Sequence, residues 1–534
     1  MNQVEVKSRQ LQAVSMILTL LTFAVAAKLT GYNGAAYLAA ALEAVTAVWI
    51  VVGGNLGDSL GRLLRVRNSR GQHKNADRLR RNAMIFQMAF GLAGSLLLLA
   101  GAGWITESVF RLRYSTFVLM VLSPVIFLRS VSAVLLGYFQ GEGTQLPTAV
   151  SGILRQVFIL GFSLLFGRLL GNYGEKVSRL LVQENFTSMY GGVGVGIAVS
   201  VSELFVVIFL YLIYRGSRRD REKYQQEGMR VAAVSFADSI RLLWSGRGLH
   251  WLTESLLFLP IPLGFVFFQK RGQGDAAVSE YGIYAAMYWV LCGVCASLVI
   301  MLLLPVSART AACLRKDEQR FARTAFQSGI HLGLVHALFA SVFLTVMAPQ
   351  LAGLFSPGMP DPARRLLQGG SFTVVLLVMI FYIGRLLIMT GGKLLVLGAV
   401  GISDVVYVIA VTVLLNTEKT GILSLVYAGI AGQAILLILL GAFCFRQLRI
   451  QPDWLQLILK PAGAAAGAGL LCALIAKLFT PHLGNGVTLL AALFVGGALY
   501  WIVLLLIRDF REQELDIIPG GRLIRSLGQL LHVC

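Results

Sequence analysis

Long apolar stretches recur along almost the whole chain, from about Leu11 to Leu506, with short polar segments between them. A helix rises about 1.5 Å per residue, so an apolar stretch of about 20 residues crosses the hydrocarbon core of a membrane. The pattern therefore predicts an all-α polytopic membrane protein with about fourteen transmembrane helices. The predicted spans are 10–29, 35–54, 84–105, 115–138, 148–170, 191–214, 248–268, 282–305, 327–348, 371–390, 394–415, 421–443, 461–479 and 486–507.

Lys and Arg are concentrated in alternate gaps between these spans. The gaps after the second, sixth, eighth and twelfth spans, and the segment after the last one, are strongly basic, whereas the others hold few positive residues. Cytoplasmic loops of membrane proteins carry an excess of Lys and Arg. Both termini are therefore predicted to lie in the cytoplasm. The same topology predicts that Ser69 faces the cytoplasm and Ser356 the outside.

The composition agrees with a membrane location: 57% of the residues are hydrophobic and 13% charged, against roughly 25% charged in soluble proteins. The net charge of +20 would favour a nucleic-acid partner in a soluble protein. Here the positive residues lie in short loops, so we expect contact with anionic lipid headgroups and no nucleic-acid partner. Cys292 and Cys295 form a C-x-x-C inside an apolar span, which indicates packing and no metal site.

The order of segments also indicates an internal duplication. Residues 74–110 and 315–355 each read as a basic helix, an apolar span and a short outer turn. Two related halves of six helices are typical of transporters. The predicted parts are an N-terminal lobe (1–214), a basic linker (215–247), a C-terminal lobe (248–445), two additional helices (446–507) and a cytoplasmic tail (508–534).

The basic linker ends in a short amphipathic pattern. Phe236, Ile240 and Leu243 recur at helical spacing. A helix with one apolar face next to a membrane commonly lies in the headgroup region. We therefore expect this helix on the inner membrane surface.

Several short motifs resemble those of a known family. Gly137-Tyr-Phe-Gln-Gly141, followed by Leu146-Pro-Thr-Ala149, is similar to the GYFQG and PTA signature of the stage V sporulation protein B and MurJ-like polysaccharide exporters. Tyr281-Gly-Ile-Tyr-Ala-Ala-Met287, Thr390-Gly-Gly-Lys393 and Glu514-Leu-Asp-Ile-Ile-Pro-Gly520 resemble further motifs of that group, in the same order. These exporters belong to the multidrug/oligosaccharidyl-lipid/polysaccharide (MOP) flippase superfamily. The resemblance implies two six-helix lobes around a central cavity, alternating access and, often, a lipid-linked sugar as cargo.

The chain departs from the family pattern at charged positions. Leu136 stands where the family usually has Arg, and Arg155, followed by Gln156, stands where it often has Glu. The Lys often found in the eleventh helix is not evident, and Asp404 lies within about one turn of its expected place. These departures indicate an altered or reversed polarity of the cavity. They predict that Arg155 and Asp404 attract one another across it.

Ionisable residues inside the spans are the candidate site residues, because each costs about 2.5–3.5 kcal/mol at the centre of a transmembrane helix. Arginine suits a diphosphate cargo, since its planar guanidinium donates paired hydrogen bonds to phosphate oxygens. The alternative is that these residues pair among themselves and hold helices together. His331 and His336 are interpreted as packed, hydrogen-bonded residues. The candidate cavity residues are Glu43, Arg129, Arg155, Gln156, Glu203, Glu254, Arg385 and Asp404, and the glycines expected in hinges or turns are Gly137, Gly141, Gly143, Gly391 and Gly392.

The sequence favours a transporter over an enzyme. It has no G-x-x-x-x-G-K-[ST] loop and no H-E-x-x-H motif, and no outer loop is long enough for a polymerase or ligase site. We expect a monomeric flippase of the bacterial cytoplasmic membrane that moves a lipid-linked sugar, polysaccharide or peptidoglycan precursor without a cofactor. Coupling to Na⁺, H⁺ or the membrane potential is left open. The alternatives are a cation-coupled drug exporter of the MATE type and a diverged scaffold that does not transport.

Overall fold

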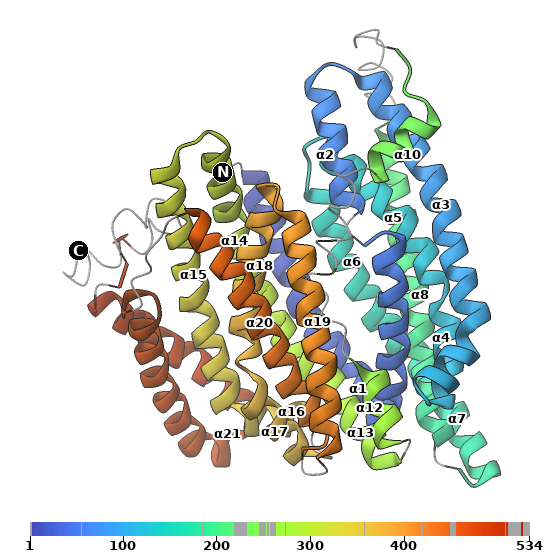
Figure 1. Ribbon diagram of the computed structural model, residues 1–534. Helices are drawn as coiled ribbons and strands as arrows, with labels where there is room; N and C mark the ends of the chain where they lie inside the picture. The colour runs from blue at the N-terminus through green and yellow to red at the C-terminus, as the bar shows by residue number, and fades with distance from the viewer. Residues whose placement is uncertain are drawn as a thin grey trace. The chain divides into compact units, whose positions relative to one another are not determined.

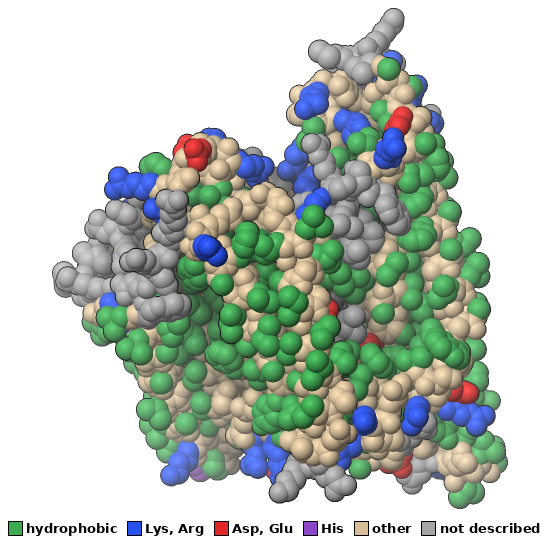
Figure 2. Space-filling view, in the orientation of Figure 1, with side chains coloured by type: hydrophobic (Ala, Val, Ile, Leu, Met, Phe, Trp, Pro, Cys, Tyr) green, Lys and Arg blue, Asp and Glu red, His purple; other side chains and the backbone are tan. Residues whose placement is uncertain are grey.

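The computed structural model of the chain consists almost entirely of helices, and the part that it describes contains no strand (Figure 1). The predicted all-α fold is therefore confirmed. Figure 2 shows hydrophobic side chains over most of the visible middle of the molecule, with Lys and Arg gathered near the helix ends. The structure describes residues 3–526 except 55, 184, 218–231, 245–252, 254–255, 257–262, 273, 357, 418–419, 449–454, 508 and 511–524.

Where the structure describes them, the connections between helices are short. Those of the first half are α1 (Gln3–Val52), α2 (Leu56–Ser69), α3 (His73–Trp104), α4 (Thr116–Leu122), α5 (Pro124–Gly141), α6 (Leu146–Phe162), α7 (Arg168–Leu181), α8 (Asn185–Gly216), α10 (Phe236–Trp244), α12 (Gly264–Arg271) and α13 (Asp275–Ile283). Those of the second half are α14 (Val290–Arg315), α15 (Gln319–Val346), α16 (Ala348–Phe355), α17 (Pro360–Gly370), α18 (Thr373–Met389), α19 (Lys393–Asn416), α20 (Leu423–Leu448) and α21 (Lys460–Leu506).

Among the described residues, ten helices are long and apolar enough to cross a membrane, or eleven if the bent pair α17 and α18 counts as one span. Two of the ten each cover two predicted spans. In α1 the two spans meet at a kink at Gly31, and in α21 they meet at a kink at Gly484. Each of the other predicted spans except the seventh coincides with one apolar helix. The seventh, 248–268, lies mostly outside the described residues.

By internal contacts the chain divides into two compact units, Met1–Ala286 and Met287–Cys534. The boundary falls inside the predicted eighth span. The sequence instead predicts a second lobe that begins at residue 248. The two divisions therefore differ for residues 248–286, which include α12 and α13.

In the first unit, glycines bring α2 and α5 into direct contact. A Cβ atom at Gly137 would lie 2.7 Å from the carbonyl oxygen of Gly57, and one at Gly141 would lie 2.6 Å from the Cβ of Leu64. Gly137 lies inside α5 and Gly141 is its last residue. The turn expected at Gly137 is thus corrected, whereas a hinge there stays a prediction. The reason is packing: small residues let two helix backbones approach closely in a membrane.

A break between α4 and α5 sets the direction of α5. Proline has no backbone N–H, so Pro124 leaves the Met120 carbonyl without its helical donor. The hydroxyl of Ser123 donates to that carbonyl at 2.8 Å. From α3, Ser95 donates to the Ser123 carbonyl at 2.8 Å and accepts from the Phe127 amide at 3.0 Å. Inserted side chains thus replace the backbone bonds that the break removes.

The amphipathic helix predicted in the linker is α10, but its buried side packs on protein. Leu243 belongs to a hydrophobic cluster with residues of α2, α3 and α5. Asn75 of α3 donates to the Ala232 carbonyl at 2.9 Å, and Asn82 donates to Ser239 at 2.9 Å. Polar and apolar contacts thus tie α10 to α3, and its expected place on the inner membrane surface stays a prediction.

In the second unit, α21 packs along α15. Tyr500 donates a hydrogen bond to the Val335 carbonyl at 2.6 Å. Just beyond α21, Asp509 Oδ2 lies 2.8 Å from His331 Nε2, and both side chains are buried. The ring of Phe510 lies against His331 at a centroid distance of 5.1 Å, tilted by 43°. His331 is thus a packed, hydrogen-bonded residue, as the sequence indicates.

Ser356, which the sequence places in an outer turn, is buried. Its hydroxyl lies 3.4 Å from the sulfur of Met287. It is therefore unsuitable as a labelling position, whereas Asp361 at the start of α17 is 71% exposed.

Candidate functional site

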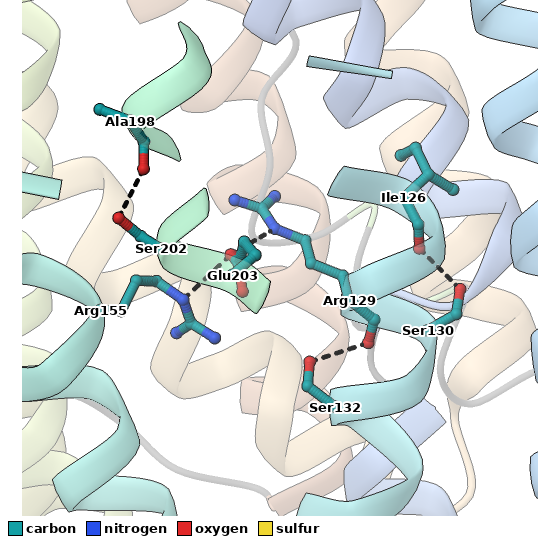
Figure 3. A network of polar contacts seen from close by, with 8 residues as sticks. All are labelled: Ile126, Arg129, Ser130, Ser132, Arg155, Ala198, Ser202 and Glu203. Carbon is teal, nitrogen blue, oxygen red and sulfur yellow. Dashed lines mark hydrogen bonds and ion pairs between the residues drawn. The ribbon is translucent and has the colours of Figure 1, made fainter. Parts of the chain in front are cut away.

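Three of the candidate cavity residues come together in the first unit (Figure 3). Arg129 of α5 and Arg155 of α6 both approach Glu203 of α8. Each guanidinium places its Nε 3.0 Å from the same carboxylate oxygen, Oε1. The three helices thus converge on one ionic cluster, which we call the arginine cluster.

The neighbouring hydroxyl groups on these helices are satisfied locally. Ser130 donates to the Ile126 carbonyl at 2.8 Å, and Ser132 donates to the Arg129 carbonyl at 3.0 Å. On α8, Ser202 donates to the Ala198 carbonyl at 2.5 Å. These hydroxyls bond within their own helices, as Ser often does in transmembrane segments. They therefore leave the charged groups of the cluster to one another and to a ligand.

The cluster carries an excess of positive charge, since two arginines share one carboxylate. Glu203 is fully buried, whereas the side chains of Arg129 and Arg155 are 29% and 25% exposed. Arg129 donates an Nε hydrogen bond to the carboxylate, whereas Arg155 forms an ion pair with it and its Nε has no hydrogen-bond partner. No described residue is a partner for their terminal guanidinium nitrogens. Two partly exposed guanidinium groups beside one buried anion form a site that attracts an anionic group with several oxygens.

Glu43 lies apart from the arginine cluster in a second buried site of the same unit. The Tyr281 hydroxyl of α13 donates to Glu43 Oε2 at 2.8 Å. The other carboxylate oxygen, Oε1, is buried without a hydrogen-bond partner. The motif at Tyr281–Met287 thus connects α13 to α1. Tyr281 donates a hydrogen bond to Glu43 of α1, and Gly282 packs against the α1 backbone at Tyr32. Tyr284 begins a π-helical turn.

The remaining cavity candidates are not brought into either site. Gln156 is half-buried next to Arg155 on α6. Arg385 of α18 and Asp404 of α19 belong to the second unit. Arg385 is half-buried with its guanidinium carbon 5.8 Å from the Phe381 ring centre, and Asp404 is exposed. Glu254 lies outside the described residues. The attraction between Arg155 and Asp404 remains a prediction, and Arg155 is already engaged by Glu203.

Two other glycines do sit in turns. Gly143 after α5 and Gly391 after α18 have φ of 85° and 100°. In both turns the next backbone N–H returns to the last helical turn: Thr144 bonds Phe139 at 3.1 Å, and Gly392 bonds Leu387 at 2.8 Å. This left-handed termination favours glycine because it has no Cβ.

Comparison with known proteins identifies the fold. No family model matches the chain. A curated relative, stage V sporulation protein B of Bacillus subtilis (strain 168), is 20% identical over 488 residues, which are 87% of this chain and 88% of the relative. An inward-facing MATE family multidrug resistance transporter of the MOP superfamily matches with a TM-score of 0.65 at 14% identity, over 83% of this chain and 98% of its own. The lipid II flippase MurJ in an inward closed conformation matches with a TM-score of 0.62 at 13% identity, over 94% and 99%.

The chain has the MOP transporter fold. Its resemblance to stage V sporulation protein B and the MurJ-like exporters, read from short motifs, is confirmed. A further neighbour is a MOP superfamily transporter from Pyrococcus furiosus, described as having a binding pocket of reverse polarity, with a TM-score of 0.53 at 16% identity over 83% of this chain and 98% of its own. The MOP fold and the many apolar helices make the chain a multi-pass membrane protein.

Sequence reasoning missed two residues that complete buried sites. Tyr281 was part of a motif, but nothing in the sequence indicated that its hydroxyl reaches Glu43, which lies 238 positions away. Asp509 was assigned to a cytoplasmic tail, whereas it is buried against His331. An acid directly after a long apolar span, together with a His inside another span, is the only signal that a sequence could offer for such a pair.

Proposed function

We propose that this protein is a flippase that moves a lipid-linked sugar diphosphate across the bacterial cytoplasmic membrane by alternating access. The arginine cluster receives the diphosphate, and the polyprenyl tail stays in the lipid. Both termini lie in the cytoplasm, the basic loops contact anionic headgroups, and the monomer is the working unit. The MOP fold, shared with a named lipid II flippase, supports a transporter of this class.

The observation that carries the proposal is the net positive charge of the arginine cluster. Glu203 neutralises one of the two guanidinium groups and holds both by Nε at 3.0 Å. The terminal guanidinium nitrogens can donate two parallel hydrogen bonds to a phosphate group, and they remain available to a ligand. A charged group inside a transmembrane region is retained chiefly where it serves transport.

The second candidate is a cation-coupled drug exporter of the MATE type, and the charge of the arginine cluster argues against it wherever the drug is a cation. The MATE structure matches the chain as well as MurJ does, so the fold alone leaves both open. A cationic drug would be repelled by a site with more arginine than acid, whereas a diphosphate would be attracted. The polarity of the arginine cluster thus favours the anionic cargo.

The test is binding and transport in proteoliposomes with a polyprenyl diphosphate-linked sugar. We expect Arg129→Gln and Arg155→Gln each to weaken binding by about tenfold, because each removes one charge-assisted contact. Arg129→Lys should fall between, since it keeps the charge and loses the planar fork. Arg179→Gln is the matched control: Arg179 also pairs with an acid, Glu175, at 2.6 Å, but its side chain is 78% exposed.

Two outcomes would refute the proposed function. If the cluster variants lose folded protein in proportion to lost transport, the arginines are structural and only hold helices together. If the folded variants bind and flip the diphosphate lipid like the unchanged protein while cationic dyes are exported, the drug-exporter alternative replaces it. A protein that folds and moves neither class of cargo would be the non-transporting scaffold.

A further inference from the structure

Glu43 is an acid in a setting that does not suit its ionised form. It lies in the second half of α1, within a predicted span, and its side chain is buried. Its Oε2 accepts one hydrogen bond, from the Tyr281 hydroxyl at 2.8 Å. Its Oε1 is buried without a partner. No described side chain forms an ion pair with it, in contrast to Glu203, which has two arginines.

The walls of this site are aromatic and tightly packed. Tyr281 is fully buried, and the Phe268 ring lies against it at a centroid distance of 4.9 Å. Tyr284 follows at 5.9 Å. On the side of α12, the backbone of Gly264 approaches so closely that a Cβ there would lie 2.8 Å from Glu43 Oε2. The Glu43 side chain is therefore almost fully buried, with 6% of its surface exposed, between α1, α12 and α13.

The groups facing Glu43 from the surrounding helices add no compensating charge. From α13 it meets the Tyr281 phenol, and from α12 the glycine backbone. The α4 sequence has no titratable side chain. The charges of α5, α6 and α8 pair with one another in the arginine cluster. Gln87 of α3 bonds the Val52 carbonyl at 2.9 Å, nine positions beyond Glu43 on α1. An ionised carboxylate here would have the Tyr281 phenol and the adjacent Gly264 backbone as its polar neighbours and no counter-charge, so the neutral acid is the stable form.

We propose that Glu43 is a proton-binding site whose protonated form is held by Tyr281 and keeps α1 closed against α12 and α13. When this contact opens, water reaches the carboxyl, the O–H bond breaks and the proton passes to water. Closure then requires a proton to return to the carboxylate. Each opening and closing of the contact thus releases and takes up one proton. The coupling of this proton to cargo rests on the proposed function; the proton site itself does not.

The geometry favours a proton over a metal cation. A hard cation needs a shell of about six oxygen ligands. Glu43 is offered one phenol oxygen and walls of aromatic rings. In the part of the chain that the structure describes, no three residues of the types His, Cys, Asp and Glu gather into a group that could hold a metal ion. A proton needs one carboxylate oxygen, and Oε1 is free to carry it.

The site is tested on the full chain in lipid nanodiscs, without any cargo. Infrared spectroscopy detects the carbonyl stretch of a protonated carboxylic acid. We expect such a band at pH 7, absent in Glu43→Gln and retained in the matched control Glu280→Gln, which changes an acid next to Tyr281 on the same helix. Tyr281→Phe should keep the band and raise its frequency, because it removes the donor to that carboxyl.

Hydrogen exchange of the α13 backbone reports the closed contact. In the unchanged protein, protection should fall as the pH rises, whereas in Glu43→Gln, a permanent neutral analogue, it should persist. Tyr281→Phe should raise the exchange rate by about fivefold, the effect of one typical hydrogen bond on an opening equilibrium. This variant keeps its ring, so it tests the contact even if Glu43→Gln does not fold. In proteoliposomes, a pH gradient should drive transport by the unchanged protein and not by Glu43→Gln.

Three results would overturn the proposal. The first is the absence at pH 7 of an infrared band that depends on Glu43. The second is protection of α13 that follows the Na⁺ concentration and not the pH, which would make the site a sodium site. The third is proton-driven transport by Glu43→Gln at the unchanged rate. The infrared and exchange results do not involve a cargo, so failure of the proposed cargo, seen in the arginine variants, is distinguishable from failure of the proton site.

Discussion

Glu203→Gln is the sharpest test of how the arginine cluster is built. The substitution keeps the shape of the side chain and removes the charge that two guanidinium groups share through one oxygen. At an effective dielectric constant of about 20, unit charges about 4 Å apart interact by about 4 kcal/mol. The neutral amide still accepts a hydrogen bond, but it leaves two positive groups close together without an anion.

The magnitude follows from which groups stay buried and unpaired. Removing one partner of a buried ion pair costs about 3–5 kcal/mol. Because Arg129 and Arg155 are partly exposed, water takes up some of that cost, and we expect the free energy of unfolding to fall by about 3 kcal/mol for Glu203→Gln. Arg129→Gln should cost only about 1 kcal/mol, since Glu203 keeps its ion pair with Arg155.

The assay is reversible unfolding in mixed micelles of lipid and SDS, followed by circular dichroism, with the melting temperature as a second measure. Glu175→Gln is the control, because it removes an exposed acid that pairs with one arginine on the protein surface, and it should change stability by less than about 1 kcal/mol. A double-mutant cycle of Arg129→Gln and Arg155→Gln should be non-additive, because only the double variant strands Glu203. Equal costs for Glu203→Gln and for each single arginine variant would refute the shared-acceptor geometry.

Three further predictions concern packing, topology and the C-terminal helices. Gly137→Val should lower the free energy of unfolding by about 2–3 kcal/mol, because its side chain meets the α2 backbone; Gly161→Val, which has open space around it, should be nearly neutral in the same unfolding assay. In a cysteine-free background, Ser69→Cys should react with a membrane-impermeant thiol reagent only from the cytoplasmic side, and Asp361→Cys only from the outside; labelling of both from one side would end the predicted topology. Asp509→Asn should lower the free energy of unfolding by about 1–3 kcal/mol, because it removes the carboxylate that pairs with the buried His331. Limited proteolysis should then cleave α21 first. Unchanged protection of α21 would show that the His331–Asp509 pair does not hold α21 in place.

Much of this protein could be predicted from local pattern alone. Apolar stretches long enough to span a membrane predicted the helices, because a helix satisfies its own backbone hydrogen bonds and needs no partner segment to do so. The glycine of the turn at Gly391 was recognisable from its position between two spans. Short motifs in a constant order indicated the MOP fold. The cost of charge in hydrocarbon pointed to Arg129, Arg155 and Glu203 before their positions were known.

The tertiary structure decided which of these charges are partners. Departures from the family pattern predicted an attraction between Arg155 and Asp404. The described ion-pair partner of Arg155 is Glu203, because α6 and α8 pack side by side with these residues at the same level. In the same way, Gly137 was expected in a turn but lies at a contact between two helices. Glu43 accepts a hydrogen bond from Tyr281, which lies far away in the sequence. Each of these outcomes depends on the rotation and register of one helix against another. Hydrophobic periodicity determines that a segment spans the membrane, but it carries little information about register, because lipid and helix neighbours are similarly apolar.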